Sequence, residues 1–202
     1  MIRRRKSMSK GKLFVISGPS GVGKGTVKAR LFEEFQKCVV YSVSATTRGP
    51  REGEVDGRDY FFIDKPEFLH RIEQDEFLEH AEFSGNYYGT PKDAVLRQLD
   101  SGKDVVLEIE VQGALQVMEK MPECVSVFIK APSFEILEQR LRGRGTETEE
   151  VILRRLTQAK RELEFAPRYM YEIINDDVEC AYLRLREIYL THSEVAHEAY
   201  RI

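Results

Sequence analysis

Short, mostly apolar runs recur along the chain, and each is bounded by polar or glycine-containing segments. Five of them have the length of a strand that is buried on both faces. They cover residues 13–16, 39–41, 105–109, 125–129 and, more weakly, 171–174. Because such strands are typical of sheets covered on both sides, the pattern predicts a five-stranded parallel sheet.

Between those runs, apolar residues recur three or four positions apart, which is the spacing of one helix face. The spacing predicts helices through residues 27–35, 95–99, 136–141 and 152–163. A Thr90-Pro91 start signal precedes the second helix, and a capping box formed by Thr146 and Glu149 opens the last. Alternating strands and helices predict an α/β fold with a parallel sheet flanked by helices.

Two segments interrupt this alternation. Residues 42–91 are richer in Gly, Tyr and Phe and contain short strand patterns such as residues 59–62, so they predict an inserted lobe of mixed structure. Residues 140–145 form a basic, glycine-broken turn between two predicted helices.

Composition and charge narrow the class of protein. The 202 residues are 42% hydrophobic, which suffices for a core, and 31 Lys+Arg against 34 Asp+Glu give a net charge of −3. This near-neutral total lacks the basic excess of nucleic-acid-binding proteins, so we expect no nucleic-acid partner. The three cysteines fit neither a disulfide framework nor a zinc motif, and no apolar run approaches the roughly 18 residues of a membrane span. We therefore expect a cytoplasmic protein without membrane contact.

The segment after the first strand carries the strongest chemical signal. It reads Gly18-Pro19-Ser20-Gly21-Val22-Gly23-Lys24-Gly25-Thr26 and leads directly into a predicted helix. Glycines let backbone N–H groups converge on a phosphate, the helix N-terminus adds partial positive charge, and Lys24 adds a full charge. The segment predicts a phosphate-binding P-loop. Gly25 stands where the usual P-loop has a Ser or Thr ligand for Mg²⁺.

Two arginines follow the second predicted strand. Arg48 and Arg51 lie in a turn-rich loop, from which their planar guanidinium groups can reach one anion. Two loop arginines on their own are more often solvated than functional. Together with the P-loop they predict a second phosphate site.

Several longer motifs resemble those of a known family. They are residues 44–51 (SATTRGPR), 53–60 (GEVDGRDY), 76–79 (EFLE), 83–90 (FSGNYYGT) and 143–147 (GRGTE). With them the chain resembles the guanylate kinases from about Lys12 to the C-terminal helix. The resemblance implies transfer of the γ-phosphoryl group of ATP to GMP, and also to dGMP, with Mg²⁺ as cofactor.

The resemblance also implies a division of the chain. A P-loop core would comprise residues 12–41, 92–132 and 160–202, after a basic tail of residues 1–11. Residues 42–91 would form the GMP-binding lobe, and residues 133–159 would form a short helical lid over the ATP phosphates.

The resemblance assigns the GMP-binding side residue by residue. The GMP phosphate would be held by Arg48, Arg51, Tyr60 and Tyr88. Glu79 would accept hydrogen bonds from the guanine N1–H and N2 amine, while Ser44 and Thr90 would donate to O6. Adenine presents an acceptor at N1, so a site built in this way discriminates against it by about 10⁴-fold or more.

The resemblance likewise assigns the ATP-binding side. The P-loop, residues 18–26, would hold the phosphates, and Asn175 would contact the adenine. The catalytic cations would be Lys24, Arg48, Arg140, Arg144 and Arg155. Arginines suit this role because phosphoryl transfer depends on positioning and electrostatics.

Two carboxylates end the third predicted strand of the core. In Glu108-Ile109-Glu110-Val111-Gln112-Gly113, the family usually has two acidic residues, often Asp. Glu110 is expected to help hold GMP, and Glu108 to lie near GMP, the phosphates and the metal. No residue is firmly assigned as a metal ligand, although Thr26 or Glu108 could hold Mg²⁺ through water.

Three questions stay open at this point. The first alternative is a catalytically inactive guanylate-kinase-like module that binds proteins, against which the intact P-loop lysine and lid arginines argue. The second is a P-loop kinase with another phosphorylated acceptor, which conflicts with Glu79. Oligomeric state is undecided.

Arg142 is expected to pair with the glutamates at 147, 149 and 150.

Overall fold

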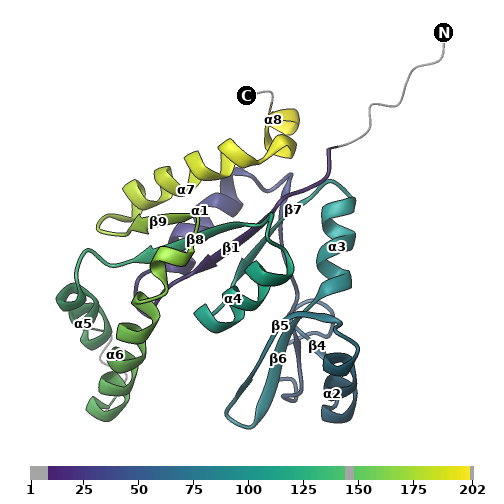
Figure 1. The fold of residues 1–202 in the computed structure, drawn as a ribbon, viewed down its shortest axis with the longest axis horizontal. Coiled ribbons are helices and arrows are strands. Elements are labelled where there is room, and N and C mark those ends of the chain that lie inside the picture. Colours follow the sequence, from purple (N-terminus) through teal and green to yellow (C-terminus); the bar gives the residue numbers. More distant parts are fainter. Residues whose placement is uncertain (1–8, 144–147, 201–202) are drawn as a thin grey trace.

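The computed structural model describes residues 9–143 and 148–200, and its core is a five-stranded parallel sheet. In spatial order the strands are β2 (Val39–Tyr41), β7 (Asp104–Glu108), β1 (Leu13–Ser17), β8 (Val125–Lys130) and β9 (Tyr171–Ile174). Neighbouring strands run parallel, so the chain returns through helices between them (Figure 1). The five strands expected from the apolar runs are confirmed to within one residue at either end.

Helices cover both faces of this sheet because alternate strand residues point to opposite sides. Phe14 and Ile16 belong to the cluster on one face, and Leu13 and Val15 to the cluster on the other. The first face is covered by α1 (Lys24–Glu34), α5 (Phe134–Arg142), α6 (Glu149–Leu163), α7 (Val178–His192) and α8 (Glu194–Tyr200). The second is covered by α3 (Lys92–Asp100) and α4 (Val111–Lys120). Among residues 9–143 and 148–200, none of the helices combines the length and apolar character needed to cross a bilayer.

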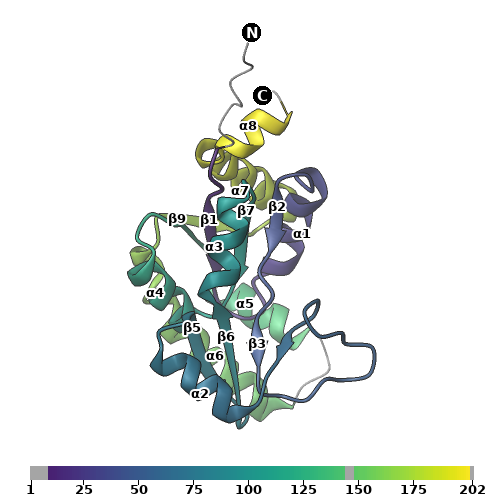
Figure 2. The ribbon, with the colours of Figure 1, turned by 90° about the vertical axis from the view of Figure 1, so that its right-hand side faces the viewer.

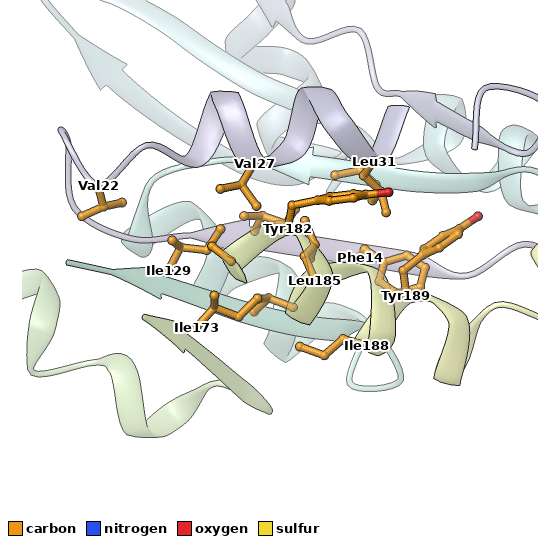
Figure 3. Close-up of a cluster of buried hydrophobic side chains, with 14 of the residues drawn as sticks. Phe14, Val22, Val27, Leu31, Ile129, Ile173, Tyr182, Leu185, Ile188 and Tyr189 are labelled. Carbon is orange, nitrogen blue, oxygen red and sulfur yellow. The ribbon is translucent and has the colours of Figure 1, made fainter. Parts of the chain in front are cut away.

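The larger cluster lies between α1 and α7 (Figure 3). Val27 and Leu31 of α1 are at most 1% exposed, as the four-residue spacing predicts. Phe14 of β1 and Tyr189 of α7 pack with their ring centroids 5.1 Å apart. This packing fixes the start of α1, and with it the loop between β1 and α1, against the sheet.

A buried carboxylate anchors the C-terminal helices to this core. Asp104 is fully buried and accepts hydrogen bonds from the Tyr189 hydroxyl at 2.7 Å, the Lys12 backbone N–H at 2.7 Å and the Ser193 hydroxyl. Burial, together with the neighbouring Asp104, raises the pKa of Tyr189, so the phenol remains a donor. The network joins β7 to the junction of α7 and α8.

Asp104→Ala is expected to lower the free energy of unfolding by more than about 2 kcal/mol, because it strands several buried donors. Urea unfolding measures the effect. Asp100→Ala is the matched control, since this carboxylate is 64% exposed and forms an ion pair with exposed Lys10; it should cost less than about 1 kcal/mol. Equal losses in the two variants would contradict the anchoring role.

A second sheet forms the inserted lobe. Its four strands, in spatial order, are β4 (Phe61–Phe62), β3 (Ala45–Thr46), β6 (Asn86–Pro91) and β5 (Phe77–Phe83). Strands β5 and β6 form an antiparallel hairpin, and α2 (Lys65–Glu73) covers the lobe through Phe68, which stacks on Phe77. The connection between β3 and β4 extends away from the sheet as a long loop (Figure 2).

Two local expectations need correction, and a third is confirmed. The strand expected over residues 59–62 covers only Phe61–Phe62, because the Asp59 side chain instead closes a turn on the Val55 N–H. The Thr90-Pro91 start signal is confirmed, since α3 begins at Lys92 with Pro91 as its N-cap residue, although both Thr90 and Pro91 also belong to β6. The helix start expected at Thr146 was wrong by two residues, since the N-cap residue of α6 is Thr148, whose side chain makes no capping hydrogen bond; Thr146 itself lies outside the described residues. A Thr at both positions makes the local signal ambiguous.

Candidate functional site

A cavity of about 560 Å³ lies where the P-loop, the end of β7, α6 and the tip of the β5–β6 hairpin meet. Its lining residues are Gly18, Ser20, Lys24, Phe83, Glu108, Ile109, Glu110, Val151, Arg154, Arg155, Gln158 and Glu162. In an α/β sheet this is the carboxyl end of the strands, where ligands are usually bound. The structure therefore brings residues from four separate parts of the sequence around one space.

The loop between β1 and α1 has the backbone that a phosphate cradle requires. Gly18, Gly21 and Gly23 have φ angles of 143°, 90° and 87°, which residues with a side chain rarely adopt. A Cβ atom on Gly18 would also lie 2.0 Å from the Ile129 carbonyl oxygen. These positions need glycine, and the turn leads directly into the N-terminus of α1, whose free N–H groups favour an anion.

Lys24 begins α1 and lines the cavity. Its Nζ donates to the backbone carbonyl oxygens of Gly18 at 2.6 Å and Pro19 at 3.0 Å, so the ammonium group lies back over its own loop. Burial lowers the pKa of Lys24, while the neighbouring carboxylates of Glu108 and Glu162 act in the opposite direction. A phosphate group entering the cavity could replace these two carbonyl partners.

Asn175 lies beneath the P-loop. The side chain is 2% exposed, and its Nδ2 donates to the Val22 carbonyl oxygen at 2.7 Å. The lid candidate Arg140 donates from Nη1 to the Asn175 carbonyl oxygen at 2.8 Å and from Nη2 to that of Asp176 at 3.2 Å. These contacts attach the P-loop and α5 to the turn after β9.

The acidic pair at the end of β7 faces the same cavity. Glu108 forms an ion pair with Lys28 of α1, whose ammonium group also lies 4.8 Å from the Tyr41 ring centroid. Glu110 is the N-cap residue of α4. Thr26 is exposed on α1 and is not among the residues that line the cavity. Among the described residues, no cluster of three or more His, Cys, Asp or Glu side chains could hold a metal ion.

Glu79 is a carboxylate held inside the lobe. It is only 8% exposed, and its Oε1 accepts from the Thr90 hydroxyl at 2.6 Å. The two residues are cross-strand partners on β5 and β6, which directs both side chains to one face of the hairpin. Burial raises the pKa of Glu79, and the nearby Glu110 carboxylate adds to the rise. Glu79 and Thr90 are not among the residues that line the cavity, but Glu110, whose charge acts on Glu79, does line it.

Helix α4 makes room for this carboxylate and attaches it to the core. A Cβ atom on Gly113 would lie 2.8 Å from the Glu79 Oε2. One turn further, the Gln116 amide bonds both the N–H and the carbonyl of His80 on the outer edge of β5, at 3.1 and 3.2 Å. Lys120 donates to the Phe77 carbonyl oxygen at 2.7 Å. The base of β5 is thus fixed to α4.

Gly113→Ala is expected to raise several-fold the KM for a substrate that binds at Glu79, without loss of stability. The new methyl group pushes the Glu79 carboxylate aside, although alanine in a helix is favourable by roughly 0.5–1 kcal/mol over glycine. Steady-state kinetics and a thermal melt measure the two effects. The control is Glu119→Ala, at an exposed position of the same helix. An unchanged KM would show that Gly113 does not shape the Glu79 site.

The loop after β3 brings a cation and two phenols together. The Arg48 guanidinium lies 5.4 Å from the Tyr60 ring centroid, and the Tyr60 and Tyr88 rings are 6.2 Å apart. Arg48 also makes a two-pronged pair with Glu54, at 3.0 and 2.8 Å, which lowers the pKa of Glu54. Arg51 is exposed in the same loop, with its backbone N–H on Glu54. Ser44 is half-buried at the start of β3.

Helix α6 lines the cavity with several residues, of which the sequence analysis singled out only Arg155. Arg155, which the resemblance assigns to the phosphates, lines the cavity, and so do Arg154, Gln158 and Glu162, which were not predicted. Their helical spacing could have suggested a common face, but not which way that face pointed. Arg144 lies outside the described residues. Arg142 pairs with Glu149 as expected, and also with Glu138, so it lies on the solvated side.

Comparisons with known proteins agree with this geometry. A family model described as guanylate kinase matches residues 10–192. A guanylate kinase of Trichormus variabilis is 54% identical over 177 residues, covering 88% of each chain, and one of Bacillus cereus is 55% identical over 179 residues, covering 89% of this chain and 87% of that protein. The crystal structure of guanylate kinase from Anaplasma phagocytophilum matches with a TM-score of 0.68 at 37% identity, covering 92% and 88% of the two chains.

Proposed function

The chain belongs to the guanylate kinase family and is an enzyme that phosphorylates GMP, and we propose that the described cavity is where it joins GMP to ATP. The observation that carries this proposal is the position of Glu110. It lines the cavity together with Lys24 of the P-loop, and it is near enough to the buried Glu79 carboxylate to raise the pKa of that group, although Glu79 and Thr90 do not themselves line the cavity. One side offers an acceptor for a base, and the other offers a cradle for phosphates.

On the acceptor side, the Glu79 carboxylate takes the guanine N1–H and N2 amine, with the Ser44 and Thr90 hydroxyls toward O6. The Glu79 Oε2 is not the atom that Thr90 bonds, which leaves it for a base. Glu110 assists at the cavity wall. This pattern of one buried acceptor and neighbouring donors matches the edge of guanine and opposes that of adenine.

The GMP phosphate binds between Arg48, Arg51, Tyr60 and Tyr88. The grouping of the Arg48 guanidinium with the two phenol rings supports this assignment. A phosphate dianion carries more charge than the half-buried Glu54 carboxylate and offers more acceptor oxygens to the guanidinium group, so it displaces Glu54 or shares Arg48 with it. Held in this way, one phosphate oxygen is positioned as the nucleophile.

On the donor side, the P-loop backbone cradles the ATP phosphates and Lys24 leaves its carbonyl partners to meet them. The GMP phosphate oxygen forms a bond to the γ-phosphorus, and the bond from that phosphorus to the bridging oxygen of ADP breaks. Arg155 and the lid arginines Arg140 and Arg144 offset the charge on the moving group. Asn175 supports the P-loop from beneath and lies at the adenine end of the site.

Mg²⁺ enters with ATP in this proposal. The donor set fits, since Mg²⁺ is usually held by one or two carboxylates, waters and substrate phosphates rather than by a protein cage. Glu108 lines the cavity and would hold the ion through water, whereas Thr26 is exposed on α1 and does not line the cavity. When bound, the ion would screen negative charge on the phosphates.

In this proposal, each part of the fold has a separate role in binding the two nucleotides. The core carries the P-loop, residues 42–91 carry the acceptor side, and residues 133–159 carry the lid, which would approach the lobe when both nucleotides are bound. We propose single nucleotides rather than nucleic acid or membrane as ligands, and the cytoplasm as the location. The free Cys38, Cys124 and Cys180 fit a reducing compartment.

A crystal structure with GMP and a non-hydrolysable ATP analogue tests these assignments together. The expected result has guanine on Glu79, the GMP phosphate on Arg48 and Arg51, and the analogue's phosphates along residues 18–26. Guanine bound away from Glu79, or the triphosphate outside the P-loop, would overturn the proposal.

A further inference from the structure

One residue of the cavity wall has no obvious role in binding phosphates. Phe83 ends β5 at the tip of the hairpin and is 66% exposed, yet it lines the same cavity as Lys24 and Glu110. Within the described part of that wall, it is the residue that the lobe contributes. An aromatic ring at the mouth of a charged cavity gains most when a second surface covers it.

That second surface is available on α6. Figure 1 shows the β5–β6 hairpin and α6 extending on either side of α4. Across the cavity from Phe83, α6 presents Val151, Arg154 and Arg155, which share one helix face through their spacing of three and four residues. An apolar side chain beside guanidinium groups is a suitable partner for an aromatic ring, which packs on aliphatic stems and attracts cations to its face.

The β5–β6 hairpin is held firmly enough to keep Phe83 in position for such a contact. Its base is attached to α4 through the bonds from Gln116 to His80 and from Lys120 to Phe77. Its tip is a tight turn in which Ser84 and Gly85 both have positive φ angles, of 50° and 78°. The hairpin therefore holds Phe83 at the wall of the cavity that α6 also lines through Arg155.

We propose that Phe83 is a positioning residue for phosphoryl transfer. When the cavity closes, its ring packs on Val151 and against the guanidinium of Arg155, which holds that arginine over the reacting phosphates and closes the cavity to water. This inference rests on the proposed function, because Arg155 is assigned to the phosphates there. It predicts an effect on kcat rather than on the binding of GMP.

The experiment compares Phe83→Ala, Phe83→Leu, Val151→Ala and the double variant Phe83→Ala/Val151→Ala with the wild-type enzyme. For Phe83→Ala we expect kcat to fall about five- to tenfold, the rate equivalent of one partly exposed ring contact. The calorimetric Kd for GMP and the melting temperature should not change. Phe83→Leu should recover part of kcat, and the double variant should lose less than the product of the single losses. Leu153→Ala is the control, because Leu153 is 52% exposed on α6 and does not line the cavity.

Each other outcome overturns the inference. An unchanged kcat in Phe83→Ala removes the role, a matching loss of GMP affinity assigns Phe83 to the acceptor site instead, and multiplicative losses in the double variant exclude contact with Val151. Failure of the proposed function is distinguishable, because then the wild-type enzyme itself would not transfer phosphate from ATP to GMP.

Discussion

Lys24→Met is expected to reduce kcat by on the order of 10²–10³-fold while GMP binding survives. The lysine supplies the full positive charge next to the P-loop glycines, and methionine replaces the stem without that charge. GMP lies on the lobe side in the proposal, so its affinity does not depend on this group. Steady-state kinetics and calorimetry with GMP alone measure the two quantities.

Lys10→Met is the matched control, because Lys10 pairs with Asp100 on the surface and both side chains are 64% exposed. It should leave both kcat and the affinity for GMP unchanged. A loss of GMP affinity in Lys24→Met as large as the loss in kcat would move Lys24 to the acceptor side. An unchanged kcat would remove it from the chemistry altogether.

Glu79→Gln is expected to raise the KM for GMP about 10- to 100-fold and to leave the KM for ATP almost unchanged. In the proposed site the Glu79 carboxylate accepts two guanine donors, and the amide that replaces it turns one of these contacts into a donor facing a donor. Glu82→Gln is the control, because it alters an exposed position of the same strand. An unchanged KM for GMP in Glu79→Gln would show that the base is recognised elsewhere.

The pH dependence of GMP binding tests whether GMP affinity depends on the negative charge of the Glu79 carboxylate rather than on the size of the side chain. Burial raises the pKa of Glu79, so this carboxyl takes up a proton at a higher pH than an exposed glutamate. The protonated form cannot accept both guanine donors, so GMP affinity falls as pH falls through that raised pKa. The phosphate of GMP titrates near pH 6 in both proteins, so we compare the ratio of wild-type to Glu79→Gln affinity between about pH 8 and about pH 5. The ratio should shrink toward acid pH, and a constant ratio would contradict the account.

The strands of the core could be predicted because their signal is local. Each apolar run is short, continuous and bounded by polar residues, so burial on both faces follows from composition alone. The P-loop could be predicted equally well, since its strand, glycines, lysine and helix follow one another directly in the sequence. The first residues of helices were harder to predict. For α6, threonine, a residue type that suits the N-cap position, stands at both 146 and 148.

The rest of the candidate site could not be predicted from the sequence, because it depends on contacts between distant parts of the chain. Gly113 accommodates Glu79, and Asn175 bonds Val22 across 153 residues, which no local pattern could reveal. The cavity face of α6 is another example, since Glu162 and Phe83 meet the site only through the way that helix and hairpin are set on the core. Candidate residues came from motifs, but which of them share one space came from the fold.

The most direct test of the central claim is an acceptor comparison with the wild-type enzyme. ADP release from ATP is measured with GMP, dGMP, AMP, UMP and a sugar phosphate as acceptors. Glu79 is buried and bonded to Thr90, and we propose that it accepts from guanine, so we expect turnover with GMP and dGMP and a kcat/KM for AMP lower by about 10⁴-fold. Turnover of AMP or of the sugar phosphate as efficient as that of GMP would contradict it.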